Sequence, residues 1–147
     1  MSDNTATVKT PIHLWIVGAL AVLWNAIGAF DYLMTQTQNE GYMGQFTPEQ
    51  LEYFYGFPMW VEATWAIAVW GGLVGSVLLL LRKCLAIPVF VASLVAMVAT
   101  TIHNYGFSDG MEVVGDATSL IFTGVIFLIS VGLLLYAQAM QKRGVLV

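Results

Sequence analysis

The chain has 147 residues, of which 59% are hydrophobic and only 10% are charged. Soluble domains carry about 25% charged residues, and one aqueous domain of this length could not bury so much apolar surface, so we expect lipid to be its solvent. The five basic residues form no stripe or arm, which argues against a nucleic-acid partner. The single cysteine, Cys84, excludes an intrachain disulfide and any relay between two thiols.

Four apolar stretches, each near or above the roughly 20 residues that cross a bilayer as a helix, predict four transmembrane spans. They cover residues 12–34, 58–81, 85–105 and 117–140. None alternates polar and apolar residues as a membrane β-strand does. We therefore expect an all-α, polytopic membrane protein, a single integral membrane domain over residues 1–147, folded as an antiparallel bundle of four transmembrane helices.

The first span begins near the N-terminus, where a secretory signal peptide would also lie. Ala26 and Gly28 form a weak cleavage pattern, but the apolar stretch continues past them to Met34. We expect this span to be retained in the bundle.

The basic residues predict the orientation of the spans. An even number of crossings places all of them on one side, and the opposite loops, residues 35–57 and 106–116, contain no Lys or Arg. Basic residues favour the cytoplasmic side, so both termini are expected there. These residues are Lys9, Arg82, Lys83, Lys142 and Arg143.

The first outer loop contains a helix start. Thr47 can cap a helix, Pro48 suits the first helical position, and Gln50 completes a capping box. We predict a short extra-membrane helix over residues 48–55 that lies at the membrane surface or caps the bundle.

Small residues recur in the spans at the spacing of helix–helix contacts. We expect them to mark packed faces. They are Gly18, Ala21, Asn25 and Gly28 in the first span, Thr64, Ala68, Gly72 and Ser76 with Gly71 and Gly75 in the second, and Ser119, Thr123 and Ser130 in the fourth.

Acidic residues gather at the outer end of the predicted bundle. Eight of the nine lie there and only Asp3 lies at the other end, so the outer end carries formal charge −8 and the inner end +4, five basic residues less Asp3. Most of these acids lie in loops and are expected to be solvated. The asymmetry nevertheless directs attention to the acids that lie within the spans.

Each span carries one polar ionisable residue near its outer end: Asp31, Glu62, His103 and Asp116. A carboxylate at membrane depth is costly and typically belongs to an inward-facing functional site with a partner. His103 could be that partner, as a cation, a proton relay or a ligand. The sequence thus predicts a ligand- or proton/cation-binding site at these four residues with Asn25. Further supporting polar side chains would be Thr100, Asn104 and Tyr105.

A purely structural explanation exists for three of the four residues. Glu62 and Asp116 lie in first helical turns, where the helix dipole favours a carboxylate, and Asp116 could be an ordinary N-cap. His103 near a helix C-terminus is likewise favoured. Asp31 lies near a helix C-terminus, where the dipole opposes it, so Asp31 is the most informative residue.

Two cofactor classes can be tested against the sequence. His13 and His103, the two histidines, lie at opposite membrane faces, which excludes an intrachain bis-histidine haem. A divalent metal held by Asp31, Glu62, His103 and Asp116 would resemble carboxylate sites in helical bundles, although their Glu-x-x-His spacing is missing. A metal site therefore stays an alternative.

Several segments of the chain have a familiar pattern. They are Trp24, Asn25, residues 28–32 (GAFDY), Met34, Thr35, residues 45–50 (QFTPEQ), Phe57, Pro58, Trp60, Trp65 and Trp70. In these segments the chain resembles a group of small, uncharacterised four-span bacterial inner-membrane proteins, some of which carry a loose sugar-transporter label. The resemblance covers most of the chain from Leu14 onward; it implies a bacterial inner membrane and four spans, and transfers no activity or ligand.

Three functional hypotheses follow. The first is a transporter-like or cation/proton-coupled binding protein with an outward-facing acidic site. The second is a non-catalytic accessory or assembly subunit of a larger membrane complex, and the third is a membrane metalloprotein or enzyme. No motif specifies a substrate, which disfavours an enzyme. A chain of this size is expected to form a homo-oligomer or to join a membrane complex in the lipid bilayer.

Overall fold

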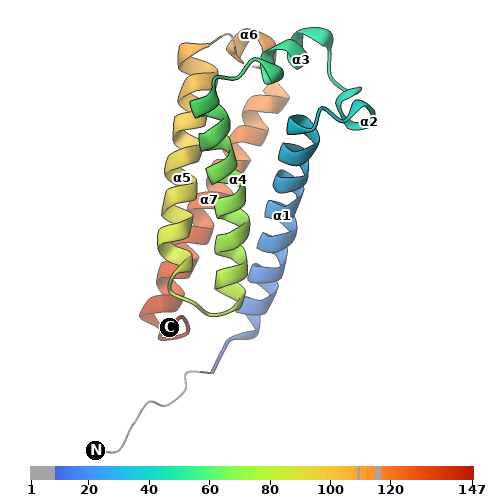
Figure 1. The fold of residues 1–147 in the computed structure, drawn as a ribbon. Helices are drawn as coiled ribbons and strands as arrows, with labels where there is room; N and C mark the ends of the chain where they lie inside the picture. Colours follow the sequence, from blue (N-terminus) through green and yellow to red (C-terminus); the bar gives the residue numbers. More distant parts are fainter. Residues whose placement is uncertain (1–8, 109, 115–116) are drawn as a thin grey trace, which may run out of the picture.

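The computed structural model describes residues 9–108, 110–114 and 117–147, and these ranges contain helices and connecting turns without a β-strand. Four long helices, α1 (Ile12–Gln36), α4 (Met59–Leu80), α5 (Ala86–Ile102) and α7 (Ala117–Lys142), run side by side (Figure 1). The predicted all-α four-helix bundle is confirmed. The helix ends lie within one to three residues of the predicted spans, and α5 is continued by a π-helical turn, η1 (His103–Phe107).

All four long helices are long and apolar enough to cross a membrane. Their apolar side chains face outward: Leu20, Val95 and Leu128 are 61%, 63% and 75% exposed. Exposure of so large an apolar surface is unfavourable in water, whereas it is favourable in the apolar interior of a lipid bilayer. Only 6% of the residues in the most apolar stretch of α7 are buried within the bundle. These features support a multi-pass membrane protein.

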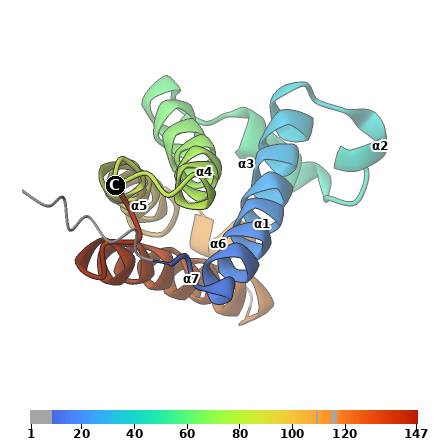
Figure 2. The ribbon, with the colours of Figure 1, turned by 90° about the horizontal axis from the view of Figure 1, so that it is seen from below.

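Helix α4 is the central element of the bundle. It packs along both α1 and α5, and α7 packs mainly against α5 (Figure 2). Helices α1 and α7 contact each other through side chains. His13 Nδ1 lies 2.5 Å from the hydroxyl of Tyr136, and the rings of Trp24 and Phe122 lie 6.0 Å apart.

Small residues permit the close approach of α4 to its neighbours, as their spacing predicts. Gly75 lies against the ring of Phe90, and Gly72 lies against Asn25. Asn25 also donates to the Ser76 hydroxyl over 3.1 Å. Gly28 differs from the expectation, because a side chain there would meet nothing within 4 Å. It faces open space instead of a packed helix.

Three short helices lie across one end of the bundle: α2 (Glu40–Met43), α3 (Pro48–Tyr55) and α6 (Gly110–Val114) (Figure 1). We call this the outer end, following the orientation that the basic residues predict. The capping box at Thr47 and Gln50 is present, and α3 has the predicted bounds. The short elements α2, α6 and η1 were not predicted from the sequence, since each is only four or five residues long.

The opposite, inner end holds the apolar core. Leu14, Leu79 and Ala137 are fully buried there, and Val145 and Leu146 of the C-terminal tail pack beside them. The tail is held by Val147, whose N–H donates to the Arg82 carbonyl over 2.9 Å. The inner half of the bundle is therefore closed by apolar packing.

Candidate functional site

Two adjoining cavities lie in the middle and outer parts of the bundle. The one nearer the short helices, the outer cavity, has a volume of about 330 Å³, and the deeper one, the central cavity, about 380 Å³. Residues of all four long helices line both. The two cavities share Asp31 of α1, Trp65 of α4, Thr100 of α5 and Phe122 of α7.

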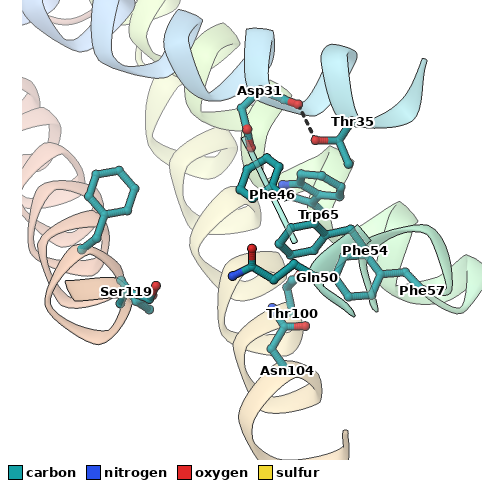
Figure 3. A pocket seen from close by; sticks show the side chains of 12 residues that line it. Asp31, Thr35, Phe46, Gln50, Phe54, Phe57, Trp65, Thr100, Asn104 and Ser119 are labelled. Atoms are coloured by element: carbon teal, nitrogen blue, oxygen red, sulfur yellow. Dashed lines mark hydrogen bonds between the residues drawn. The ribbon is translucent and has the colours of Figure 1, made fainter. Parts of the chain in front are cut away.

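Aromatic rings form one wall of the outer cavity (Figure 3). Phe46 and Phe54 meet edge to face with ring centroids 5.3 Å apart, and Phe57 meets Trp65 in the same way at 6.0 Å. Figure 3 shows these rings beside Asp31, with Ser119 of α7 on the far side of the hollow. Since α3 and the loop before it supply Phe46 and Phe54, the short outer helix helps to build the site.

The central cavity combines hydroxyl and amide groups with apolar walls. Asn25 donates to the Ala21 carbonyl over 2.8 Å, and Ser93 donates to the Ala68 carbonyl over 2.6 Å. Gly28 lines this cavity, which explains the open space above its backbone. Residues that the spacing suggested as packing positions thus serve here as cavity lining.

Asp31 is the one acidic side chain among the described residues that line either cavity. Its Oδ1 accepts a short hydrogen bond from the hydroxyl of Tyr42, and Thr35 donates to its backbone carbonyl over 2.8 Å. No described residue donates to Oδ2. The tyrosine contact partly offsets the unfavourable position of a carboxylate near a helix C-terminus, and one carboxylate oxygen stays available.

Tyr42 lies on α2 and lines the central cavity. Burial, the hydrogen bond to Asp31 and the charge of that carboxylate together raise the pKa of its hydroxyl from 10.0 to about 12. Its ring meets the Phe30 ring edge to face at 5.6 Å. Tyr42 therefore remains a protonated donor to Asp31 throughout the physiological pH range.

Glu62 lies apart from the cavities. It is in the first turn of α4 and lines neither of them. Within the described part of the chain no hydrogen bond or ion pair involves its carboxylate. The favourable end of the α4 dipole is a sufficient structural explanation for Glu62. Asp116, the other predicted acid, lies outside the described residues.

His103 is buried behind the wall of the outer cavity. Its ring meets the Trp60 ring at 5.3 Å and the Phe57 ring at 6.0 Å, and Nδ1 lies 3.2 Å from Oδ1 of Asn104. His103 lines neither cavity, whereas Phe57 and Asn104 line the outer one. Any influence of His103 on the cavity would pass through these two neighbours.

The predicted site residues are thus only partly brought together. Asp31 and Asn25 share the central cavity, while Glu62 and His103 stay outside it. Over residues 9–108, 110–114 and 117–147, no three His, Cys, Asp or Glu side chains are grouped closely enough to hold a metal ion. Of the predicted residues with an ionisable side chain, Asp31 is the one among the described residues that lines a cavity.

The aromatic wall and Tyr42 were not predicted from the sequence as parts of a site. Part of the aromatic wall could have been predicted. Gln50 and Phe54 are four residues apart in the predicted helix and therefore share one of its faces. Both line the outer cavity. No local pattern links Tyr42 or Trp65 to Asp31.

Comparisons with protein-family models, with curated proteins and with solved structures found no match.

Proposed function

We propose that this protein binds a small cation at Asp31, as a transporter-like or cation- or proton-coupled binding protein. The observation that carries the proposal is the position of Asp31, the one acid that lines two adjoining cavities between the four long helices. A carboxylate removed from water costs several kcal/mol unless a partner offsets the charge.

The neighbouring side chains provide a donor but no countercharge. Tyr42 supplies a neutral hydroxyl, and no Lys, Arg or His is among the described residues that line the cavities. A bound cation or proton would complete the electrostatics. The vacant hydrogen-bonding capacity of Oδ2 gives such a ligand a direct contact with the carboxylate.

The proposal includes a location. The basic residues at the inner end and the resemblance to bacterial inner-membrane proteins favour a bacterial inner membrane with both termini in the cytoplasm. The site would then face the outer side. Because apolar side chains close the inner half, transport would require a second conformation, and we propose that a homo-oligomer or a larger membrane complex supports it.

Ligand-dependent thermal unfolding tests the proposal. The purified protein in lipid nanodiscs is heated in chloride salts of sodium, potassium, calcium and tetramethylammonium at equal ionic strength, and across a pH series. A cation that binds only the folded state raises the free energy of unfolding by about 2.7 kcal/mol when its concentration is about 100 times its Kd. We expect a response to at least one cation or to pH that disappears in Asp31→Asn.

Glu62→Gln is the matched control, because it makes the same acid-to-amide change outside the cavities. It should respond like the wild type. Equal responses of Asp31→Asn and the wild type to every cation and pH would contradict the proposed function.

A further inference from the structure

We propose that the ligand is an organic ammonium ion with apolar substituents, held between the Asp31 carboxylate and the aromatic wall of the outer cavity. The inference rests on the proposed function and names the ligand class of the same site. Three properties of the cavity support it: its sparse charge, its aromatic lining and its size.

The charge at the site suits a monovalent organic ion better than a metal ion. Calcium takes six to eight oxygen ligands, and magnesium requires an octahedral set. Asp31 is the one carboxylate available, and no group of three potential metal ligands exists among the described residues. An organic cation carries its charge on alkylated nitrogen and needs no complete shell of oxygens.

The aromatic wall supplies the complementary attraction. Trp and Phe rings attract a cation placed over their faces within about 6 Å of the centroid, and such cages recognise quaternary ammonium groups. Phe46, Phe54, Phe57 and Trp65 all line the outer cavity. Figure 3 shows Asp31 directed from α1 toward these rings, so a ligand could contact the carboxylate and the ring faces together.

Edge-to-face and tilted contacts between the rings also fix them in position. Phe54 is held by Phe46 at 5.3 Å and by Phe57 at 6.2 Å, and Phe57 is held in turn by Trp65. A preformed cage loses less conformational entropy when it binds.

The volume of the outer cavity, about 330 Å³, lies at the lower end of the range for small-molecule sites, roughly 300–1,000 Å³. It is far larger than a dehydrated inorganic ion needs. A neutral sugar could also stack on aromatic rings, but it would leave the Asp31 charge without compensation. The uncompensated carboxylate therefore favours the ammonium ion.

A charged ligand and its neutral isostere test the inference. Benzyltrimethylammonium and neopentylbenzene have the same shape and differ in the nitrogen charge. Their binding to the full chain in lipid nanodiscs is measured by equilibrium dialysis, after subtraction of partitioning into empty nanodiscs. We expect saturable binding of the cation alone, with affinity lowered about 10- to 100-fold by Asp31→Asn.

Variants of Trp65 test the aromatic contact. Trp65→Leu should weaken binding of benzyltrimethylammonium by about 3- to 30-fold, whereas Trp65→Phe, which keeps a ring face, should retain most of the affinity. Trp70→Leu is the matched control, since Trp70 lies on α4 and lines neither cavity. If circular dichroism shows that Trp65→Leu does not fold, the pair Phe54→Leu and Phe54→Tyr replaces it.

Three results would overturn the inference: equal binding of the neutral isostere, unchanged affinity in the ring-removing variants, or binding of glucose but not of the cation. Asp31-dependent binding of sodium or protons without binding of benzyltrimethylammonium would overturn the inference and leave the proposed function standing. If no response to any cation or to pH depended on Asp31, both the inference and the proposed function would be rejected.

Discussion

At the scale of single residues, the most informative feature of the outer end is the pair formed by Asp31 and Tyr42. Asp31 belongs to a membrane-spanning helix and Tyr42 to a short helix outside it, so their hydrogen bond connects the bundle to its outer cover. It also leaves Oδ2 of the carboxylate without a donor among the described residues. The pair can stabilise the empty protein without satisfying the charge of Asp31.

The titration of Tyr42 should report this contact. Its pKa in the folded protein is raised to about 12, so its contribution to the free energy of unfolding is complete below pH 10 and is lost as the pH rises through 12. The difference in tyrosinate ultraviolet absorbance between the wild type and Tyr42→Phe should show a transition near pH 12. A transition near pH 10 would contradict the partly buried hydrogen bond to Asp31.

At the scale of elements, the closeness of α4 and α5 depends on small residues. A β-carbon added at Gly75 would lie 2.7 Å from two ring carbons of Phe90, and Phe90 is only 4% exposed. The ring has little room to move, so the helices themselves would have to separate. In lipid, such close packing is a main source of helix association.

We therefore expect Gly75→Ala to lower the free energy of unfolding by about 1–3 kcal/mol, as overpacked cores do. Reversible unfolding in mixed micelles measures the change. Gly132→Ala on α7 is the control, because a β-carbon there meets nothing within 4 Å. Helix propensity alone favours Ala over Gly at both positions, so an equal effect of the two substitutions would contradict a specific clash with Phe90.

The outer elements show how much local patterns reveal. The capping box of α3 was predictable because its hydrogen bonds join residues three positions apart. The π-helical turn η1 was not predicted, because no local pattern marks it. Its first residue, His103, packs against the rings of Trp60 in α4 and Phe57 in the loop before α4, which are distant in the sequence.

At the scale of the whole molecule, the bundle is asymmetric along its axis. Apolar packing closes the inner half, whereas the cavities, the aromatic wall and Asp31 occupy the middle and outer parts. The start of α1 and the C-terminal end of α7 lie together at the inner end (Figure 1). This arrangement suits a site that is reached from the outer side.

Cysteine labelling tests the predicted orientation. In a Cys84→Ser background, Glu52→Cys on α3 should react in intact cells with a membrane-impermeant maleimide, whereas Lys142→Cys should react only after the membrane is permeabilised. The reverse pattern would place the site on the cytoplasmic side.

The sequence by itself determined the four spans, the all-α bundle and the asymmetry of charge, because apolar length and the location of basic residues act locally along the chain. It also singled out Asp31, since a carboxylate near a helix C-terminus has no local stabilisation. Only the tertiary structure decided which polar residues share a site. There Asp31 accepts a hydrogen bond from Tyr42 and lines the outer cavity together with Trp65 and Phe54. Glu62 and His103 line neither cavity. The physical reason is that convergence depends on how each helix is rotated and on the path of the outer loop, and both are set by packing between residues far apart in the chain.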